Sequence, residues 1–267
     1  MTAPESVDLT QPRTLGPLLT DALRVYFRHF LTFTVVGFVV VAPAQAIVSG
    51  VGLGQFSKGY DSTPPLAAST IPLAVQALVT SPLIAAMCVY LLTDLSESRP
   101  VSAWRAIQRG LDAFGPVFVP VLTALAAEAL LTILFVVPLA LALGFAFVPT
   151  VILPVILAVR WYFAPQAVVV GGARRLQALR DSWELTRAQG WRVAGIVFLV
   201  LVTFQTASGL LSTPLVALAR SADSGALLVA SDVFGQTLAT PAVAVVAAFL
   251  FYDLRARRRV AAERGVS

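Results

Sequence analysis

The feature that most constrains this chain lies between Arg160 and Val202, where a charged stretch separates two long apolar runs. From Arg174 to Arg187, apolar residues recur at helical spacing while charged residues fill most of the remaining positions. This pattern predicts an amphipathic helix that lies flat on a membrane surface. Its apolar positions are Leu176, Leu179 and Trp183, and its charged positions are Arg174, Arg175, Arg180, Asp181, Glu184 and Arg187.

Composition indicates an integral membrane protein. Of the 267 residues, 58% are hydrophobic and only 12% are charged, whereas soluble domains carry about 25% charged residues. The net charge of +5 comes from short arginine-rich clusters beside the apolar runs, without the basic-aromatic modules of nucleic-acid-binding proteins. We therefore expect membrane lipids, and no nucleic acid, as partners.

Six membrane spans are predicted, because a helix needs about 20 apolar residues to cross a bilayer core. The apolar stretch 116–159 is too long for one span, and we expect it to fold back through Gly144 as two. The expected fold is an all-α polytopic helix bundle with amphipathic surface helices. The predicted spans are about 30–51, 71–93, the two halves of 116–159, 193–218 and 227–252.

Two further amphipathic segments precede the first and third spans. One begins at Leu15, and the other contains an apolar face opposite a charged face. In the second segment the apolar face consists of Trp104, Ile107, Leu111 and Phe114, and the polar face of Arg105, Gln108, Arg109 and Asp112.

The distribution of basic residues predicts the topology. With six spans, nearly all arginines fall on one side of the membrane, and only Lys58 and Arg220 fall on the other. The positive-inside rule then places both termini in the cytoplasm. Since Glu5 and Asp8 precede any basic residue, no cleaved signal is predicted. We expect residues 1–13 to be a disordered cytoplasmic tail, 14–258 a six-span membrane domain and 259–267 a basic cytoplasmic tail.

A shared spacing in the even-numbered spans predicts a threefold internal repeat. The copies would be parallel and related by an axis along the membrane normal, over residues 14–95, 98–170 and 172–258. The alternative is that apolar spans with a proline resemble one another without any repeat. The shared spacing puts a proline twelve residues before a polar residue, at Pro82 and Asp94, Pro154 and Gln166, and Pro241 and Asp253.

The run ARRLQALRDSWELTRAQGWRV after RWYFAP, with the terminal FYDLRARRR, resembles bacterial six-span membrane proteins related to the glycerophosphoryl diester phosphodiesterase membrane domain. The resemblance implies a multi-pass protein of the bacterial cell membrane. It implies no hydrolysis, because the hydrolytic domain of that family is a separate soluble module. This chain departs from the family pattern at Val170, where an acidic residue is usual, and at Asp181, where a second arginine is common.

Glu128 and Arg160 form a candidate intramembrane polar pair. An ionised carboxylate in the middle of the third span costs at least about 2.5 kcal/mol, so Glu128 must face the bundle, be protonated or have a partner. Arg160 could reach inward to Glu128 or extend back to the lipid headgroups. The pair would then be a proton or substrate site, a structural tie, or a neutral glutamate with a separate arginine.

Other polar residues indicate structure rather than chemistry. Asp94 and Asp253, at the cytoplasmic ends of spans, are expected to pair with arginines of the surface helices. Gln45, Gln205 and Gln236 form a polar strip that serves either interhelical hydrogen bonds or a pathway. The sequence contains one histidine, one cysteine and no phosphate loop, zinc motif or nucleophile elbow. We therefore expect that the protein is not an enzyme and has no metal site or cofactor.

We therefore predict a non-enzymatic membrane-organising protein that contacts anionic inner-leaflet lipids or a membrane protein partner. The alternative is a transporter or channel that uses a polar site around Glu128 and Arg160. The predicted lipid-surface residues are Trp104, Arg105, Arg109, Arg174, Arg175, Arg180, Trp183 and Arg187.

Overall fold

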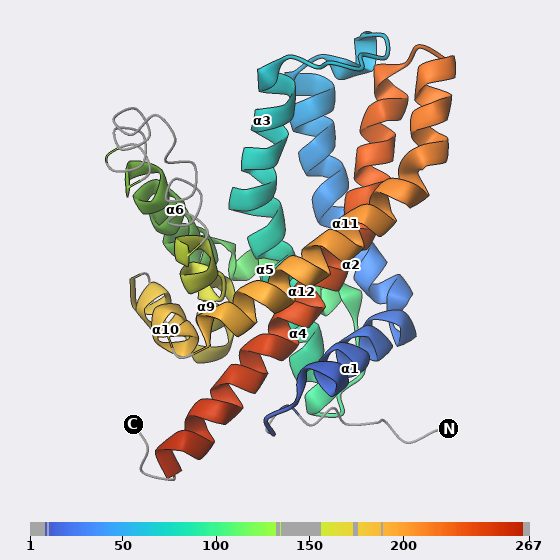
Figure 1. Ribbon diagram of the computed structural model, residues 1–267. Coiled ribbons are helices and arrows are strands. Elements are labelled where there is room, and N and C mark those ends of the chain that lie inside the picture. The colour runs from blue at the N-terminus through green and yellow to red at the C-terminus, as the bar shows by residue number, and fades with distance from the viewer. Residues whose placement is uncertain are drawn as a thin grey trace.

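The computed structural model describes residues 9, 11–131, 134, 156–172, 176–187 and 189–263. These residues form helices and connecting turns, and no strand occurs among them (Figure 1). The helices are α1 (Leu15–Arg28), α2 (Phe30–Gln45), α3 (Leu66–Val75), α4 (Ser81–Ser96), α5 (Ala103–Asp112), α6 (Phe114–Leu131), α9 (Ala164–Gly171), α10 (Leu176–Thr186), α11 (Gly190–Ser221) and α12 (Gly225–Glu263).

In the part of the chain that the structure describes, which is all-helical, five helical segments are long and apolar enough to cross a membrane, and this confirms the prediction of a helical fold with several apolar spans. Most of the second half of 116–159, with the predicted fold-back at Gly144, lies outside the described residues. What is described of the fourth span belongs to a shorter apolar helix, Ile156–Gly171. The five segments are Phe30–Gly52, Leu66–Ser96, Phe114–Leu131, Gly190–Ser221 and Gly225–Glu263.

Two of these segments contain π-helical turns close to prolines. Ala46–Gly52 continues α2 beyond Pro43, and Gln76–Thr80 joins α3 to α4. A proline has no N–H to donate, so the helix around it must rearrange its hydrogen bonds. The segments Phe30–Gly52 and Leu66–Ser96 therefore bend without ending.

The connections between helices gather at the two ends of the bundle. In Figure 1 the loop before α3 and the turn between α11 and α12 lie together at the top, whereas α1, α10 and the C-terminal part of α12 lie toward the bottom. The loop and the turn are in contact at the top. The Gly225 backbone N–H donates to the Lys58 carbonyl at 2.9 Å, and the Tyr60 N–H donates to Asp223 Oδ1 at 2.9 Å.

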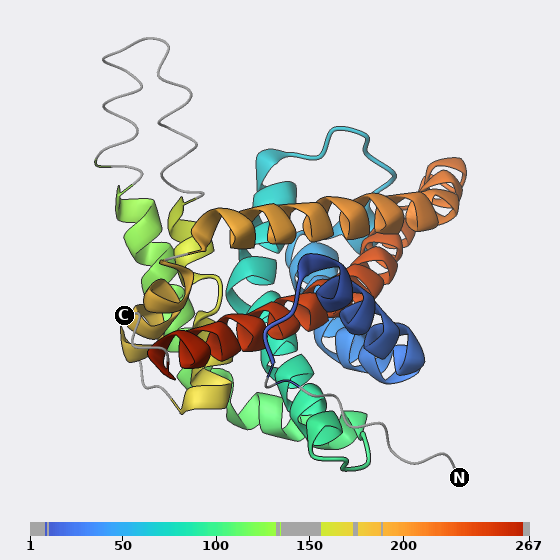
Figure 2. The ribbon, with the colours of Figure 1, turned by 60° about the horizontal axis from the view of Figure 1, so that its bottom comes forward.

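The longest helix, α12, forms the centre of the packing. It contacts α1, α2, α4 and α11, and α11 and α12 diverge from their shared turn (Figure 2). Its crossing with α2 is close because α2 presents Gly37 there. A Cβ at Gly37 would lie 2.7 Å from both Pro241 Cγ and the Thr237 carbonyl oxygen. Such contacts between small residues bring membrane helices together.

Helix α1 is joined to α12 by Tyr26, which is 2% exposed. Its hydroxyl donates a hydrogen bond to the Leu238 carbonyl oxygen at 2.9 Å, in the turn before Pro241. Burial, with a smaller effect of Cys88, raises the pKa of Tyr26 to about 12, so its hydroxyl keeps its proton.

The ends of the chain differ in detail from the expected tails. Arg13, the last residue of the predicted N-terminal tail, is hydrogen-bonded to the helix bundle through its backbone. At the other end, α12 continues to Glu263, past the predicted boundary at residue 258. Asp253 and Arg257 pair one turn apart within this part of α12.

Candidate functional site

A network of hydrogen bonds joins the C-terminal part of α12 to the start of α11 and to the residue before α1. The Asp253 carboxylate, 3% exposed, accepts from Arg192 Nη1 and Arg257 Nε, both at 2.9 Å. It also accepts from the Arg13 backbone N–H at 2.6 Å. The Arg13 carbonyl oxygen accepts from both guanidinium groups. A buried carboxylate requires such partners, so Asp253 fixes three segments at this arginine-rich end.

A second aspartate fixes α5 in the same way. Arg109 Nη1 lies 3.0 Å from Asp94 Oδ1, and Asp94 is 1% exposed at the end of α4. Gly110 of α5 packs against Met87, because a Cβ there would lie 2.3 Å from Met87 Cγ. The expected pairing of Asp94 with a surface-helix arginine is therefore present. Arg109, predicted to contact lipid, also donates to Asp94, and its side chain remains 38% exposed.

The rest of α5 turns outward. Ile107 of the predicted apolar face is buried, but Trp104 and Leu111 are exposed. Arg105 is half-buried and donates to the carbonyl oxygen of Pro100. The helix therefore presents a mixed apolar and basic side away from the bundle.

The predicted central surface helix corresponds to α10. Leu179 is buried, whereas Arg180, Trp183 and Arg187 are exposed. Arg174 and Arg175 lie outside the residues that the structure describes. Arg258 Nη2 lies 2.6 Å from Glu184 Oε2, so α10 is also tied to the end of α12.

Glu128 and Arg160 lie in different surroundings, and no ion pair joins them in the described part of the chain. The Arg160 guanidinium stacks over the Trp183 ring at 5.1 Å from its centroid and approaches Gly190. Trp183 also packs against Trp161, with ring centroids 6.5 Å apart. The Arg160 guanidinium is thus held against α10, whereas Glu128 borders a separate cavity between helices.

This cavity, about 320 Å³ in volume, lies between helices that are distant in sequence. Its walls come from the π-helical turn 76–80, α4, α6, the Ile156–Gly171 helix, α11 and α12. Most of its lining is apolar, as in binding sites for small molecules. The polar side chains that line it are Gln76, Ser81, Glu128, Tyr162, Gln166, Gln205 and Thr240.

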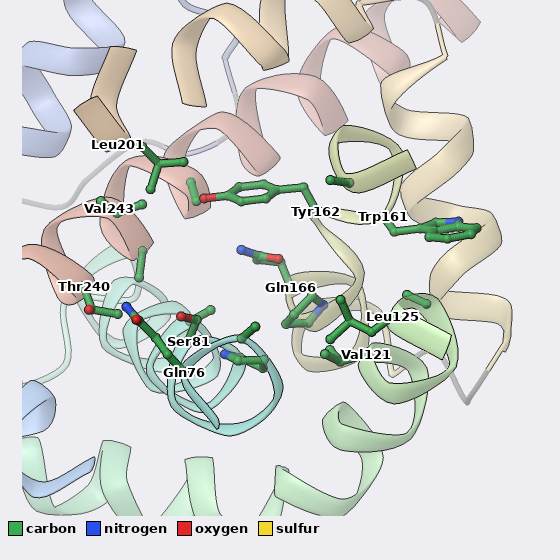
Figure 3. A pocket seen from close by; sticks show the side chains of 18 of the residues that line it. Gln76, Ser81, Val121, Leu125, Trp161, Tyr162, Gln166, Leu201, Thr240 and Val243 are labelled. Carbon is green, nitrogen blue, oxygen red and sulfur yellow. The ribbon is translucent and has the colours of Figure 1, made fainter. Parts of the chain in front are cut away.

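Gln166 is the most deeply buried polar residue in this wall, with 2% exposure. Figure 3 shows its amide group in the cavity, between Tyr162 and the side formed by Gln76, Ser81 and Thr240. Gln166 Oε1 has no hydrogen-bond partner within the described ranges. A buried polar atom without a partner costs about 1–3 kcal/mol, so the cavity offers a binding contact that the protein leaves open.

Sequence reasoning identified Glu128 and Gln205 of this cavity but missed the role of Gln166. In the sequence, Gln166 was notable only because it lies twelve residues after Pro154, as Asp94 and Asp253 lie after their prolines. Its position in a cavity depends on helices that meet only in the folded chain. Trp191, 83% exposed at the start of α11, was also missed. The sequence did contain a signal for an interfacial tryptophan, because Trp191 lies beside Arg192 at the start of an apolar span.

The described residues hold no group of three or more histidine, cysteine, aspartate or glutamate side chains that could bind a metal ion. Comparisons of the chain with protein-family models, curated proteins and solved structures gave no match.

Proposed function

We propose that this chain is a multi-pass protein of the bacterial cell membrane that contacts anionic lipids of the inner leaflet through its surface helices and catalyses no reaction. In this proposal it has six spans and cytoplasmic termini, and belongs with the six-span proteins that its last hundred residues resemble. Organisation of lipids, or of a membrane protein partner, follows from that contact.

The observation that carries this proposal is the set of exposed tryptophans beside arginines. Trp104 is 66% exposed and Trp191 is 83% exposed, and Trp183 is exposed between Arg180 and Arg187. Large aromatic side chains are costly to expose to water but are favoured at the membrane interface. Arginines near them attract anionic headgroups.

The charges of α10 are available for this role. Neither Arg180 nor Arg187 forms an ion pair with any residue that the structure describes. A basic residue near an anionic leaflet contributes about 1 kcal/mol of attraction. The two arginines together would favour anionic over zwitterionic lipid by about 2 kcal/mol.

Three junctions at the arginine-rich end support the threefold repeat. In the first two, the end of one predicted copy contacts the surface helix of the next copy, and in the third the end of the last copy contacts Arg13, directly before the first copy. Copies placed around a common axis would have this cyclic order. The junctions are Asp94 with Arg109, Phe163 N–H with Ser182 Oγ, and Asp253 with the Arg13 backbone.

The lipid preference can be measured by tryptophan fluorescence in nanodiscs. The full-length protein is placed in equal mixtures of phosphatidylglycerol and phosphatidylcholine, with brominated tails on one lipid or the other. We expect stronger quenching by brominated phosphatidylglycerol. The double variant Arg180→Gln, Arg187→Gln should lose most of this preference.

Arg220→Gln is the matched control, because Arg220 lies at the opposite end and contacts Tyr60. It should leave the preference unchanged. Equal quenching of the native protein by the two brominated lipids would refute the proposal.

The cavity beside Glu128 favours a second candidate, a transporter or channel. Its polar lining within apolar helices is typical of substrate pathways. Proteoliposomes of the native protein and of Glu128→Gln test it through proton and cation flux. Identical flux in both, at the level of empty liposomes, would exclude this candidate.

A further inference from the structure

The cavity between α4, α6, α11 and α12 contains more polar groups than the protein itself satisfies. Gln166 Oε1 is buried without a partner, and Glu128 makes no hydrogen bond or ion pair with the described residues. Both groups accept hydrogen bonds. A molecule that occupies this cavity can therefore satisfy them by donating hydrogen bonds.

The charge of the lining selects among such molecules. Among the described residues that line the cavity, Glu128 is the only one with an ionisable carboxyl group, and none is a lysine, arginine or histidine. The sequence from Pro116 to Val159 contains no basic residue either. Since Arg160 is stacked on Trp183, no described residue supplies a cation for Glu128. An anionic ligand would be repelled, and a cationic one would be attracted.

The remaining wall suits a hydrocarbon chain and a cation together. Pro82, Val121, Leu125 and Val243 line it with apolar surface. Trp161 and Tyr162 add aromatic rings, which attract ammonium groups through their π-electrons. A volume of about 320 Å³ is at the lower end of the range for small-molecule sites.

We propose that this cavity binds an amphiphile with a protonated amine, whose ammonium group contacts Glu128 and the Gln166 amide oxygen while its hydrocarbon chain lies along the apolar wall. The ammonium group could belong to a lipid headgroup or to a free amphiphilic amine. The site is separate from the exposed sides of α5 and α10. Failure to bind an amine would therefore leave the lipid preference of the surface helices untouched, and the reverse also holds.

The probe pair is octylamine and 1-octanol, which differ mainly in charge. Full-length protein in phosphatidylcholine nanodiscs is titrated with each by calorimetry, and empty nanodiscs correct for partition into lipid. Charge-assisted hydrogen bonds are about twice as strong as neutral ones. We expect octylamine to bind about tenfold more tightly than 1-octanol, which corresponds to about 1.4 kcal/mol.

Three variants identify the residues involved. Glu128→Gln should bring the affinities for the two probes to within about twofold, since only the charge is removed. Gln166→Leu should weaken both probes. Glu97→Gln, which removes an exposed carboxylate at the end of α4, is the matched control and should keep the tenfold preference.

A variant that fills the cavity separates loss of binding from loss of folding. Ala158 lines the cavity from an exposed position, so Ala158→Phe can fill the space with little change to the packed core. It should abolish binding of both probes with an unchanged melting temperature. The proposal is overturned if neither probe binds, if 1-octanol binds as tightly as octylamine, or if Glu128→Gln retains the preference.

Native mass spectrometry separates the two sources of the ammonium group. The protein is extracted from vesicles of phosphatidylethanolamine and phosphatidylglycerol. If the ligand is a lipid, the native protein should retain phosphatidylethanolamine, and the Ala158→Phe variant should not. Retention of no lipid, with octylamine still binding, indicates a free amine. Retention of phosphatidylglycerol that Ala158→Phe removes would contradict the assignment of a cationic ligand.

Discussion

Arg192 Nη1 lies 2.9 Å from Asp253 Oδ2, a contact that joins the start of α11 to the C-terminal part of α12. Asp253→Asn should lower the free energy of unfolding by about 2 kcal/mol. This is less than the roughly 3–5 kcal/mol of a fully buried pair, because both arginine partners keep contact with water. Thermal unfolding in detergent measures the change.

The matched control for this prediction is Glu97→Gln. Its partner Arg99 lies 2.9 Å away, but both side chains are about half exposed. Such surface pairs contribute about 0–1 kcal/mol. If Glu97→Gln destabilised the protein as much as Asp253→Asn, the Asp253 network would have no special structural role.

The contact of Gly37 with α12 predicts a strong steric effect. Gly37→Ala should destabilise the protein by about 1–3 kcal/mol, because its Cβ would lie 2.7 Å from the backbone of Thr237. Gly195→Ala is the control, since nothing lies within 4 Å of that Cβ position. It should be neutral or stabilising by up to about 1 kcal/mol. Equal melting temperatures for the two variants would contradict the close crossing of α2 and α12.

Removal of one hydroxyl tests the attachment of α1. Tyr26→Phe deletes the hydrogen bond to the Leu238 carbonyl and should cost about 1 kcal/mol. Hydrogen exchange of α1 should rise while that of α4 stays constant. Tyr60→Phe, at the opposite end, should change neither measurement. Unchanged exchange of α1 in Tyr26→Phe would show that this hydrogen bond does not hold the helix.

His29, between α1 and α2, is expected to contribute to the pH dependence of the protein's stability. Burial, and secondarily the charge of Arg28, lower the pKa of His29 below its usual 6.5. The unfolded chain then binds a proton more readily than the folded protein, so stability falls as the pH drops below about 6.5. His29→Gln should show a smaller loss of melting temperature over this range. A loss equal to that of the native protein would exclude a contribution from His29.

The helical spans could be predicted because they depend on local sequence. Apolar runs of about bilayer length coincide with Phe30–Gly52 and with α11. The end of α4 at Ser96 and the start of α11 at Gly190 lie beside equally simple changes between apolar and charged residues. Hydrophobicity and helical spacing carry this information without any tertiary contact.

The assembly of the site could not be predicted in the same way. Gln166 and Thr240 line one cavity although they are far apart in sequence. Ser81 and Thr240, directly before Pro82 and Pro241, also line this cavity, and the shared proline spacing did not predict that they would. Which face of each helix turns inward depends on packing such as that at Gly37.

The alternatives for Arg160 also required the folded chain. Its sequence position allowed either an inward contact with Glu128 or an outward position. The choice depends on Trp183, which comes from another helix and receives the guanidinium group on its ring. A contact between residues on separate helices leaves no periodic signal in the sequence.

The most direct test of the membrane arrangement is cysteine labelling in intact cells. The single native cysteine, Cys88, is fully buried, so it should not react. Single variants Arg187→Cys, in the turn after α10, and Asp61→Cys, in the loop before α3, are exposed to an impermeant maleimide. We predict labelling of Asp61→Cys in intact cells and of Arg187→Cys only after permeabilisation. Labelling of Arg187→Cys in intact cells would contradict an inner-leaflet position for α10.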